Sequence, residues 1–271
     1  MKIACAHSYS KPLDIEDNIK RIEGFLRIFD EERVEYALFP ELSVSGYFND
    51  KDELCKYSVY QSDILNSLRH LSHRYNVVFA VGLPMMENDK WYIAQVVFQY
   101  GQIIGKHYKT HLSESEARTF SKGEQLNQIP FSSCITGFQI CLETHVPELS
   151  SIHQQRGAQI LSMPFASPRE TPNDKLKRLG LMIQARAYDN ACYVMACNLT
   201  GFTPSGKSYA GFSIIINPRG EVIASQMGYE PGYCMATIDL NEIDRIKQSR
   251  MGYFPGMKRM EWLTGLYKSF D

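Results

Sequence analysis

The sequence predicts an α/β protein in which helices flank a mixed β-sheet. Two patterns support this fold class. Early in the chain, strand-like apolar runs alternate with segments whose apolar residues recur at helical spacing, and later strands follow one another across short turns. The length of 271 residues and the 44% content of hydrophobic residues are sufficient for one large layered domain.

The elements of the first half follow from apolar periodicity and from turn residues. Amphipathic helices are expected between residues 15 and 29 and between residues 61 and 75, because apolar side chains recur there every three or four positions. Turns are expected at residues 88–89 and 100–101. Strands are expected at residues 2–6, 35–39, 77–83, 91–99 and 102–108.

In the second half, a strand-like run ends at Cys141 and a helix is expected to start near Pro147. A longer helix is expected at residues 174–190. Further strands are expected at residues 158–163, 191–197, 210–217, 222–226 and 233–238. The whole chain is interpreted as one domain, in which residues 251–271, rich in Met, Gly and aromatic residues, form a C-terminal arm.

Composition argues against several classes of protein. A net charge of −1 without a Lys/Arg-rich block gives no reason to expect a nucleic-acid partner. The first apolar run is too short for a signal peptide, and no segment approaches the roughly 18 apolar residues of a membrane span. Seven cysteines without paired Cys-x-x-Cys spacing argue against a disulfide framework and a structural zinc site, so a cytoplasmic location is expected.

Three apolar runs each end on a side chain that can take part in catalysis. Tyr-Ala-Leu-Phe-Pro leads to Glu41, a second run leads to Lys109, and Gly-Phe-Gln-Ile leads to Cys141. The residues after Cys141 are typical of a turn and a helix start, where backbone N–H groups can bind an anion. A carboxylate, an ammonium group and a thiol at strand ends predict one catalytic site.

The same segments carry a family resemblance. Residues 39–47 read Phe-Pro-Glu-Leu-Ser-Val-Ser-Gly-Tyr, residues 105–112 read Gly-Lys-His-Tyr-Lys-Thr-His-Leu, and residues 140–148 contain Ile-Cys-Leu-Glu and Pro-Glu. In this order they resemble the signatures of the nitrilase superfamily, carbon–nitrogen hydrolases with a Glu–Lys–Cys triad. The resemblance extends from residue 2 to about 239. It implies one carbon–nitrogen hydrolase domain over residues 1–271, with a four-layer αββα sandwich of mixed β-sheets.

The resemblance also implies a role for each catalytic candidate. Cys141 is expected to be the nucleophile, and because a neutral thiol attacks poorly it needs a base. Glu41 fits that role, since burial at a strand end would raise its pKa. Lys109 is expected to stabilise an oxyanion together with the backbone N–H of Leu142. Glu116, four residues before a Phe as in the family, is expected to pair with Lys109 and orient the substrate.

The sequence departs from the family pattern where the substrate pocket is expected. Glu143 stands where amidase-like members carry Asp and true nitrilases carry Glu, and His145 stands where Arg is common. A histidine such as His111 or His145 is the alternative base for the thiol. Arg169 is a candidate for binding a substrate carboxylate. By position, the candidate substrate-binding residues are Tyr47, Leu142, His145, Phe165 and Asn198.

We therefore expect hydrolysis of a non-peptide C–N bond in a small amide or N-carbamoyl substrate, through a thioester on Cys141. Ammonia or an amine would be released. The alternatives are a nitrile hydrolase of the same superfamily and a non-catalytic protein that binds a small amide. No metal or cofactor is expected, because ligand spacing and a phosphate-binding glycine loop are both missing from the sequence. A homodimer or higher homo-oligomer is expected from the resemblance.

Overall fold

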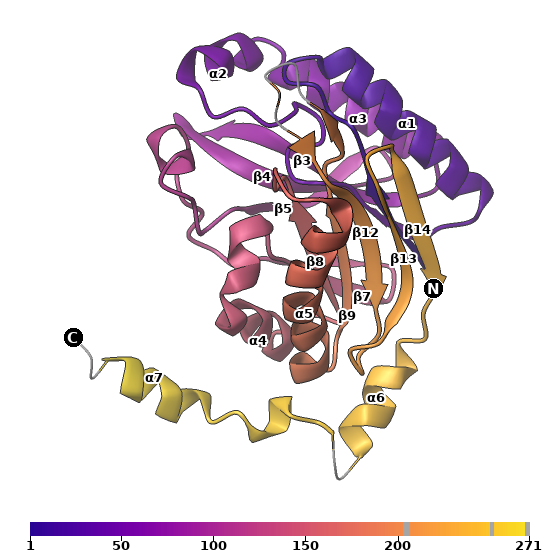
Figure 1. Ribbon diagram of the computed structural model, residues 1–271, viewed down its shortest axis with the longest axis vertical. Helices are drawn as coiled ribbons and strands as arrows, with labels where there is room; N and C mark the ends of the chain where they lie inside the picture. The colour runs from indigo at the N-terminus through magenta and orange to yellow at the C-terminus, as the bar shows by residue number, and fades with distance from the viewer. Residues whose placement is uncertain (203–205, 207, 250–251, 269–271) are drawn as a thin grey trace.

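The protein is built around two six-stranded mixed β-sheets packed face to face (Figure 1). This computed structural model describes residues 1–202, 206, 208–249 and 252–268. A small hairpin of β10 (Gly201–Phe202) and β11 (Ser208–Tyr209) lies outside the two large sheets.

The first sheet has the strand order β14-β1-β2-β3-β4-β5. Its strands are β1 (Lys2–His7), β2 (Tyr36–Leu38), β3 (Val78–Glu87), β4 (Lys90–Gln99), β5 (Gln102–Tyr108) and β14 (Gly232–Thr237). β1, β2 and β3 are parallel, and β5 has the same direction because it follows β4 in an antiparallel meander. The carboxyl ends of β2 and β5 therefore lie at one edge of the sheet, next to Glu41 and Lys109.

The second sheet has the strand order β13-β12-β9-β8-β7-β6. Its strands are β6 (Gln128–Phe131), β7 (Cys134–Phe138), β8 (Ile160–Phe165), β9 (Tyr193–Asn198), β12 (Gly211–Ile216) and β13 (Val222–Gly228). β7, β8 and β9 are parallel, so the segments that follow them leave the sheet at the same edge. Cys141 follows β7, and Ala166 follows β8.

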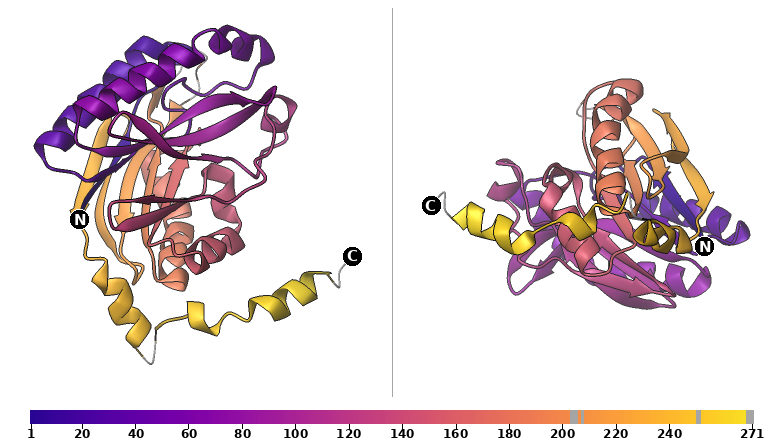
Figure 2. Two further views of the ribbon diagram at one scale, coloured as in Figure 1. Left: turned by 180° about the vertical axis from the view of Figure 1, so that it is seen from behind. Right: turned by 90° about the horizontal axis from the view of Figure 1, so that it is seen from below.

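Helices cover the outer face of each sheet, which gives four layers (Figures 1 and 2). α1 (Ile15–Glu31) and α3 (Gln61–Arg74) pack on the first sheet, while α4 (Pro147–Gln155) and α5 (Pro172–Asn190) lie against the second. Between the sheets, apolar side chains from both inner faces form one core, among them Ile3, Leu38, Val97, Phe138, Tyr193 and Ile215. The expected four-layer αββα sandwich is confirmed.

Some elements differ from the sequence-based expectation. α2 (Lys51–Ser58) was not predicted, because only Leu54 and Tyr57 on this short helix are buried. The side chain of Asp50 caps it by accepting hydrogen bonds from two backbone N–H groups. The β6–β7 hairpin was also not predicted. The strand expected to end at Cys141 is shorter than that: β7 ends at Phe138, and Cys141 begins the 3-10 helix η2 (Cys141–His145).

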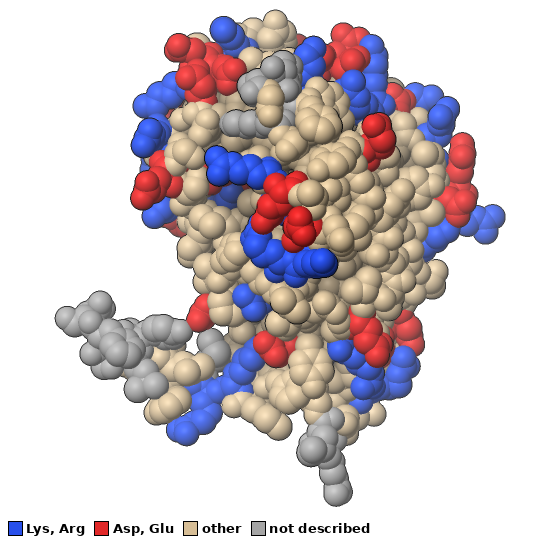
Figure 3. All heavy atoms as spheres, viewed as in Figure 1, with Lys and Arg blue, Asp and Glu red and all other residues tan. Residues whose placement is uncertain are grey.

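The last described segment runs past the end of the sandwich, and only its final helix extends away from it (Figure 2). The segment comprises α6 (Asn241–Gln248), η3 (Pro255–Met257) and α7 (Met260–Lys268). Before that last helix, Ile243 and Ile246 are buried, and Lys258 donates to Ser151 and Asn190. Of the expected arm, residues 251 and 269–271 lie outside the described residues. No helix within the described ranges is long and apolar enough to cross a membrane. On the face shown in Figure 3, acidic and basic side chains are interspersed.

Candidate active site

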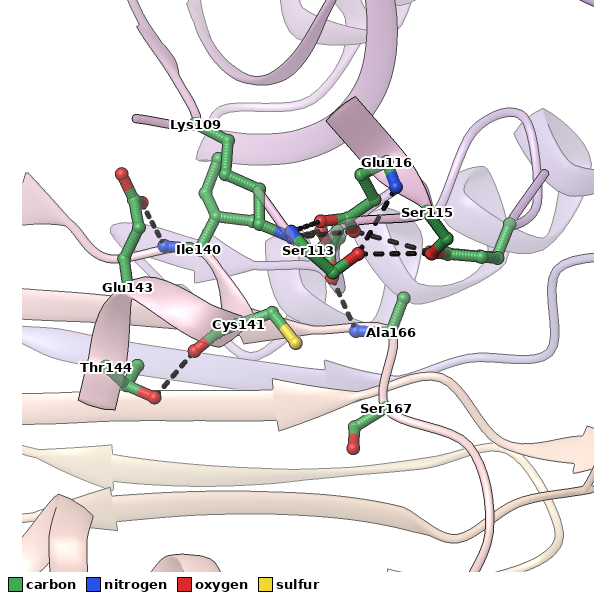
Figure 4. A network of polar contacts seen from close by, with 12 residues as sticks. Lys109, Ser113, Ser115, Glu116, Ile140, Cys141, Glu143, Thr144, Ala166 and Ser167 are labelled. Carbon is green, nitrogen blue, oxygen red and sulfur yellow. Dashed lines mark hydrogen bonds and ion pairs between the residues drawn. The ribbon is translucent and has the colours of Figure 1, made fainter. Parts of the chain in front are cut away.

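The edges of the two sheets bring the three predicted catalytic side chains together. Lys109 Nζ lies 2.6 Å from Glu41 Oε1 and 2.9 Å from Glu116 Oε1. Glu41 and Lys109 are each 1% exposed, so this charge cluster is removed from water. In Figure 4 the thiol of Cys141 points into the space framed by Lys109, Glu116 and Ala166. The strand ends named from the sequence therefore meet at one site.

Glu41 is held by contacts at both carboxylate oxygens. Oε1 accepts from Lys109, and Oε2 accepts the backbone N–H of Ala166 at 2.9 Å. The backbone before Glu41 is also fixed, because Gln95 Nε2 donates to Phe39 O at 2.9 Å. On the other side, a Cβ on Gly82 would lie 2.2 Å from Leu42 N. Only glycine permits this close approach of β3 to the Glu41 turn.

Cys141 occupies a strained turn between β7 and α4. Its φ is +49°, a left-handed conformation that is uncommon for residues other than glycine. The hydroxyl of Thr144 donates to Cys141 O at 2.6 Å and holds the turn closed. Cys141 and Leu142 are consecutive residues of one 3-10 turn, so the thiol and the backbone N–H of Leu142 belong to the same turn.

Glu143 connects the cysteine turn to the lysine strand. Its fully buried carboxylate accepts hydrogen bonds from the backbone N–H groups of Ile140 at 2.6 Å and Thr110 at 2.7 Å. It also accepts from the Thr110 hydroxyl at 2.5 Å and from His107 Nε2 at 3.0 Å. Glu143 therefore fixes the backbone next to Cys141 relative to the backbone next to Lys109. The position of Glu143 was noted from the sequence, but this function was not predicted.

The electrostatic environment suits base-assisted attack by the thiol. Burial, together with the nearby Glu41 carboxylate, raises the pKa of Cys141 to about 12 although Lys109 opposes the rise. Burial also raises the pKa of Glu41, with Lys109 opposing and Glu116 adding to the rise. For Lys109, burial opposes the charged form, but Glu41, Cys141 and Glu116 together raise the pKa well above its usual range. Cys141 is thus a protonated thiol beside a carboxylate, and Lys109 is a fixed cation.

Glu116 lies in η1 (Glu116–Arg118) and completes the charge cluster. Besides Lys109, its carboxylate accepts the backbone N–H of Ser113 at 2.9 Å and the Tyr47 hydroxyl at 3.4 Å. Burial raises the pKa of the Tyr47 phenol well above its usual range, and the Glu116 carboxylate adds to the rise. Tyr47 is half-buried and its hydroxyl reaches the site.

The other candidate substrate-binding residues occupy different positions. Leu142 and His145 are exposed beside the cysteine turn. Partial desolvation of the His145 ring and the cations Arg178 and Arg186 lower the pKa of His145. Phe165 is buried against Phe212 in the core under α5.

The amide of Asn198 is engaged on both sides. Its Oδ1 accepts from Ser167 N at 2.9 Å, and its Nδ2 donates to the carbonyls of Ser167 and Ala210. The contacts of Phe165 and Asn198 favour a supporting position, and their role as substrate contacts stays a prediction. Arg169, the candidate for a carboxylate, is exposed on the segment that follows β8.

Two features of the site escaped the sequence analysis. The backbone N–H of Ala166 carries no side-chain signal, although its position after a strand that runs parallel to β7 could have indicated it. Gly82 lies inside a strand, where an isolated glycine often marks a close backbone approach, and that signal was available. Among the described residues, no group of three or more His, Cys, Asp or Glu side chains is arranged to hold a metal ion.

Comparison with curated proteins gives relatives across most of the chain. The 2-oxoglutaramate amidase of Bacillus subtilis (strain 168) is 30% identical over 89% of this chain and 91% of that protein. The omega-amidase of Saccharomyces cerevisiae is 27% identical over 92% of this chain and 90% of its own length. The glutamine-dependent NAD(+) synthetase of Aquifex aeolicus is 31% identical, but the chain spans only 41% of that protein.

Solved structures show the same fold. An amidase from Nesterenkonia sp. superposes with a TM-score of 0.85 at 21% identity, covering 98% of this chain and 96% of that one. In a variant of that amidase, acrylamide has added to the active-site cysteine. A family model described as carbon-nitrogen hydrolase matches residues 2–248. Given that match and the 30% identity to the Bacillus amidase, this chain belongs to the carbon-nitrogen hydrolase family.

Proposed function

We propose that the protein hydrolyses the C–N bond of a small carboxamide through a thioester on Cys141. The observation that carries this proposal is the buried contact of Lys109 with Glu41 and Glu116, at the sheet edge where the Cys141 turn also ends. A binding protein would gain nothing from burying two carboxylates and an ammonium group, because their desolvation is costly. A hydrolase uses all three with the thiol.

The first half of the reaction forms the thioester. Glu41 accepts the proton of the Cys141 thiol while Sγ attacks the carbonyl carbon of the amide. The electron pair of the C=O bond moves to oxygen, and the resulting oxyanion is stabilised by Lys109 and the N–H of Leu142. Glu41 then returns the proton to the amide nitrogen, the C–N bond breaks, and ammonia or an amine leaves.

The second half releases the acid. Water attacks the thioester carbonyl while Glu41 accepts one of its protons, and the same two groups stabilise the second oxyanion. As the C–S bond breaks, Glu41 returns the proton to the sulfur of Cys141. The raised pKa of Glu41 suits this repeated exchange, since a base works best when its pKa lies near the working pH. Glu116 holds Lys109 through both halves and thereby fixes the oxyanion site.

The names of the relatives support a substrate class. Two of them are a 2-oxoglutaramate amidase and an omega-amidase. We therefore infer that the substrate is a small amide that also carries a carboxylate, with an N-carbamoyl acid as the remaining member of the predicted class. We propose that Tyr47, Leu142 and His145 contact this substrate. Leu142 and His145 are exposed beside the cysteine turn, and the Tyr47 hydroxyl donates to Glu116, which supports the proposal.

The experiment is ammonia release from a panel of carboxamides, omega-amides, N-carbamoyl acids and nitriles. Cys141→Ala removes the nucleophile, and Cys55→Ala is the matched control because Cys55 is an exposed cysteine on α2. We expect release from an amide by the wild type and by Cys55→Ala, and less than about a thousandth of it by Cys141→Ala. Equal release by Cys141→Ala would contradict the proposal, and release from nitriles alone would assign the nitrile-hydrolase alternative.

We further infer a single catalytic domain that forms a homo-oligomer in the cytoplasm. All seven cysteines are free thiols, as a reducing compartment would keep them.

Residues 251–271 are assigned as an arm for a second copy, because Trp262 on the extending helix α7 is 52% exposed. Sedimentation of wild type and Trp262→Asp tests the arm, with a lighter species expected for the variant. A monomeric wild type would contradict the oligomer, and an extracellular fraction would contradict the location.

A further inference from the structure

The segment that follows β8 supports the candidate general base from outside the charge cluster. Ala166, its first residue, donates its backbone N–H to Glu41 Oε2 at 2.9 Å. The next residue, Ser167, is labelled beside it in Figure 4. This segment has no regular secondary structure of its own to fix the direction of that N–H. Its position is therefore set by contacts with neighbouring elements. The backbone N–H of Arg169 donates to Ser208 O at 2.8 Å, and side chains hold the residues before Arg169.

One of those side chains is Lys175, on the first turn of α5. The residue is 1% exposed, which is rare for a lysine. Its Nζ donates to Ser167 Oγ at 2.9 Å and to Pro168 O at 3.0 Å, and it lies 2.8 Å from Glu170 Oε2. Three acceptors match the three donors of an ammonium group, so the cost of burying the charge is offset only while the segment keeps this shape.

The backbone of the segment is strained. Arg169 and Glu170 have φ values of +68° and +65°, which residues other than glycine rarely adopt in succession. Such conformations persist only where surrounding contacts determine them. Lys175 contacts Ser167 and Pro168 before this pair and Glu170 within it. Arg178 forms a bidentate ion pair with Glu170 at 2.9 and 3.0 Å. Asn198 holds Ser167 from the β9 side.

We propose that Lys175 is a positioning residue for catalysis, which fixes the segment after β8 so that the Ala166 N–H stays directed at Glu41. This inference rests on the proposed function, in which Glu41 is the general base. Lys175 does not contact the reacting atoms, and it acts through two covalently adjacent residues, Ser167 and Ala166.

The consequence is a shift in the pH profile of Glu41. The groups that face Glu41 are Lys109, Glu116, Cys141, the phenols of Tyr47 and Tyr209, and the Ala166 N–H. The N–H lowers the pKa of Glu41, while burial raises it. Losing that hydrogen bond leaves the other groups in place and raises the pKa of Glu41 further. Because the base must be ionised, the acid limb of reactivity moves to higher pH, by about one pH unit for one hydrogen bond to a charged group.

The test variant is Lys175→Met, which keeps the unbranched chain and removes the ammonium group. Lys177→Met, an exposed lysine two residues further on α5, is the matched control. Ser167→Ala removes a single acceptor of Lys175 and serves as the test if Lys175→Met does not fold. For each protein we would measure kcat/KM against pH and, separately, the rate at which iodoacetamide alkylates Cys141, read by mass spectrometry of the Cys141 peptide.

We expect the acid limb of both profiles to move up by about one pH unit in Lys175→Met. In Ser167→Ala the limb should move in the same direction by less, and in Lys177→Met it should not move. An unshifted limb in folded Lys175→Met, or in Ser167→Ala if the first variant does not fold, overturns the inference. The alkylation profile does not depend on turnover, so a wild type without amidase activity would refute the proposed function while this readout still decides the role of Lys175.

Discussion

Replacing Glu143 by Gln should weaken both the fold and the reaction. The carboxylate accepts four hydrogen bonds, from Ile140 N, Thr110 N, Thr110 Oγ1 and His107 Nε2. A glutamine keeps one acceptor oxygen and turns the other into an NH₂ group. Because all four partners are donors, at least one of them then faces another donor, and a buried N–H such as that of Ile140 loses its acceptor.

The size of the effect follows from the pKa of Glu143. Burial opposes ionisation, but His107 and the Thr110 donors outweigh it and lower the pKa from its usual 4.5 to about 2. At about 1.4 kcal/mol for each pH unit, the charged form is stabilised by roughly 3 kcal/mol in the folded state. Loss of that stabilisation should lower the melting temperature by roughly 6–12 °C in a chain of this size. Displacement of the Cys141 turn should also reduce kcat/KM about a hundredfold.

Thermal unfolding and kcat/KM would be measured for wild type, Glu143→Gln and Glu143→Asp. Aspartate keeps the charge on a shorter side chain, so an intermediate result is expected. The folded-state pKa is lowered, so the stabilisation is fully present above about pH 5 and is lost as the pH falls from 4.5 towards 2. The difference between wild type and Glu143→Gln should therefore shrink below pH 4.5. A Glu143→Gln protein with wild-type melting temperature and wild-type kcat/KM would refute this reasoning.

Three further predictions follow from the site and its supports. Glu41→Gln should lower kcat/KM by about a thousandfold and abolish its acid limb, and a pH profile that keeps the limb would point to a histidine base instead. Gly82→Ala should lower the free energy of unfolding, measured by urea titration, by roughly 1–3 kcal/mol, because the added Cβ would meet backbone atoms 2.2–2.7 Å away. Wild-type stability would contradict this. Buried His153 accepts from Gln128 Nε2 and donates to Phe138 O, and burial lowers its pKa to about 4. Protonation of His153 is less favourable in the folded protein than in the unfolded chain. Part of the free energy of unfolding should therefore be lost as the pH falls from about 6.5 towards 4, and His153→Gln should reduce that loss.

The sequence predicted the positions of Glu41, Lys109 and Cys141 because each follows an apolar run. Strand direction then decides which strand ends lie together. In the first sheet β2 is parallel to β3, and β5 has the same direction after the antiparallel β3-β4-β5 meander, so Glu41 and Lys109 follow the same end of that sheet. In the second sheet β7 is parallel to β8, so the segments with Cys141 and Ala166 leave at the same end. Periodicity alone indicated a mixed sheet with helices, whereas the two-sheet sandwich came from the family resemblance. The structure confirms the sandwich.

The remaining features were beyond sequence reasoning for physical reasons. The N–H of Ala166 is a backbone group that every residue except proline possesses, so its function depends on where the chain turns. The left-handed conformation of Cys141 has no signature in its side chain. Lysines such as Lys175 are normally exposed, and only tertiary contacts reveal that this one is buried.

The most direct test of the account is mass spectrometry of the Cys141 peptide, quenched during turnover of an amide substrate. We expect a mass increase on Cys141 equal to the acyl group of the substrate less the one hydrogen that it replaces. The increase should disappear when the substrate is consumed and be missing in Cys141→Ala. Full turnover without any acyl adduct on Cys141, or with the adduct on another cysteine, would contradict the assignment of Cys141 as the nucleophile.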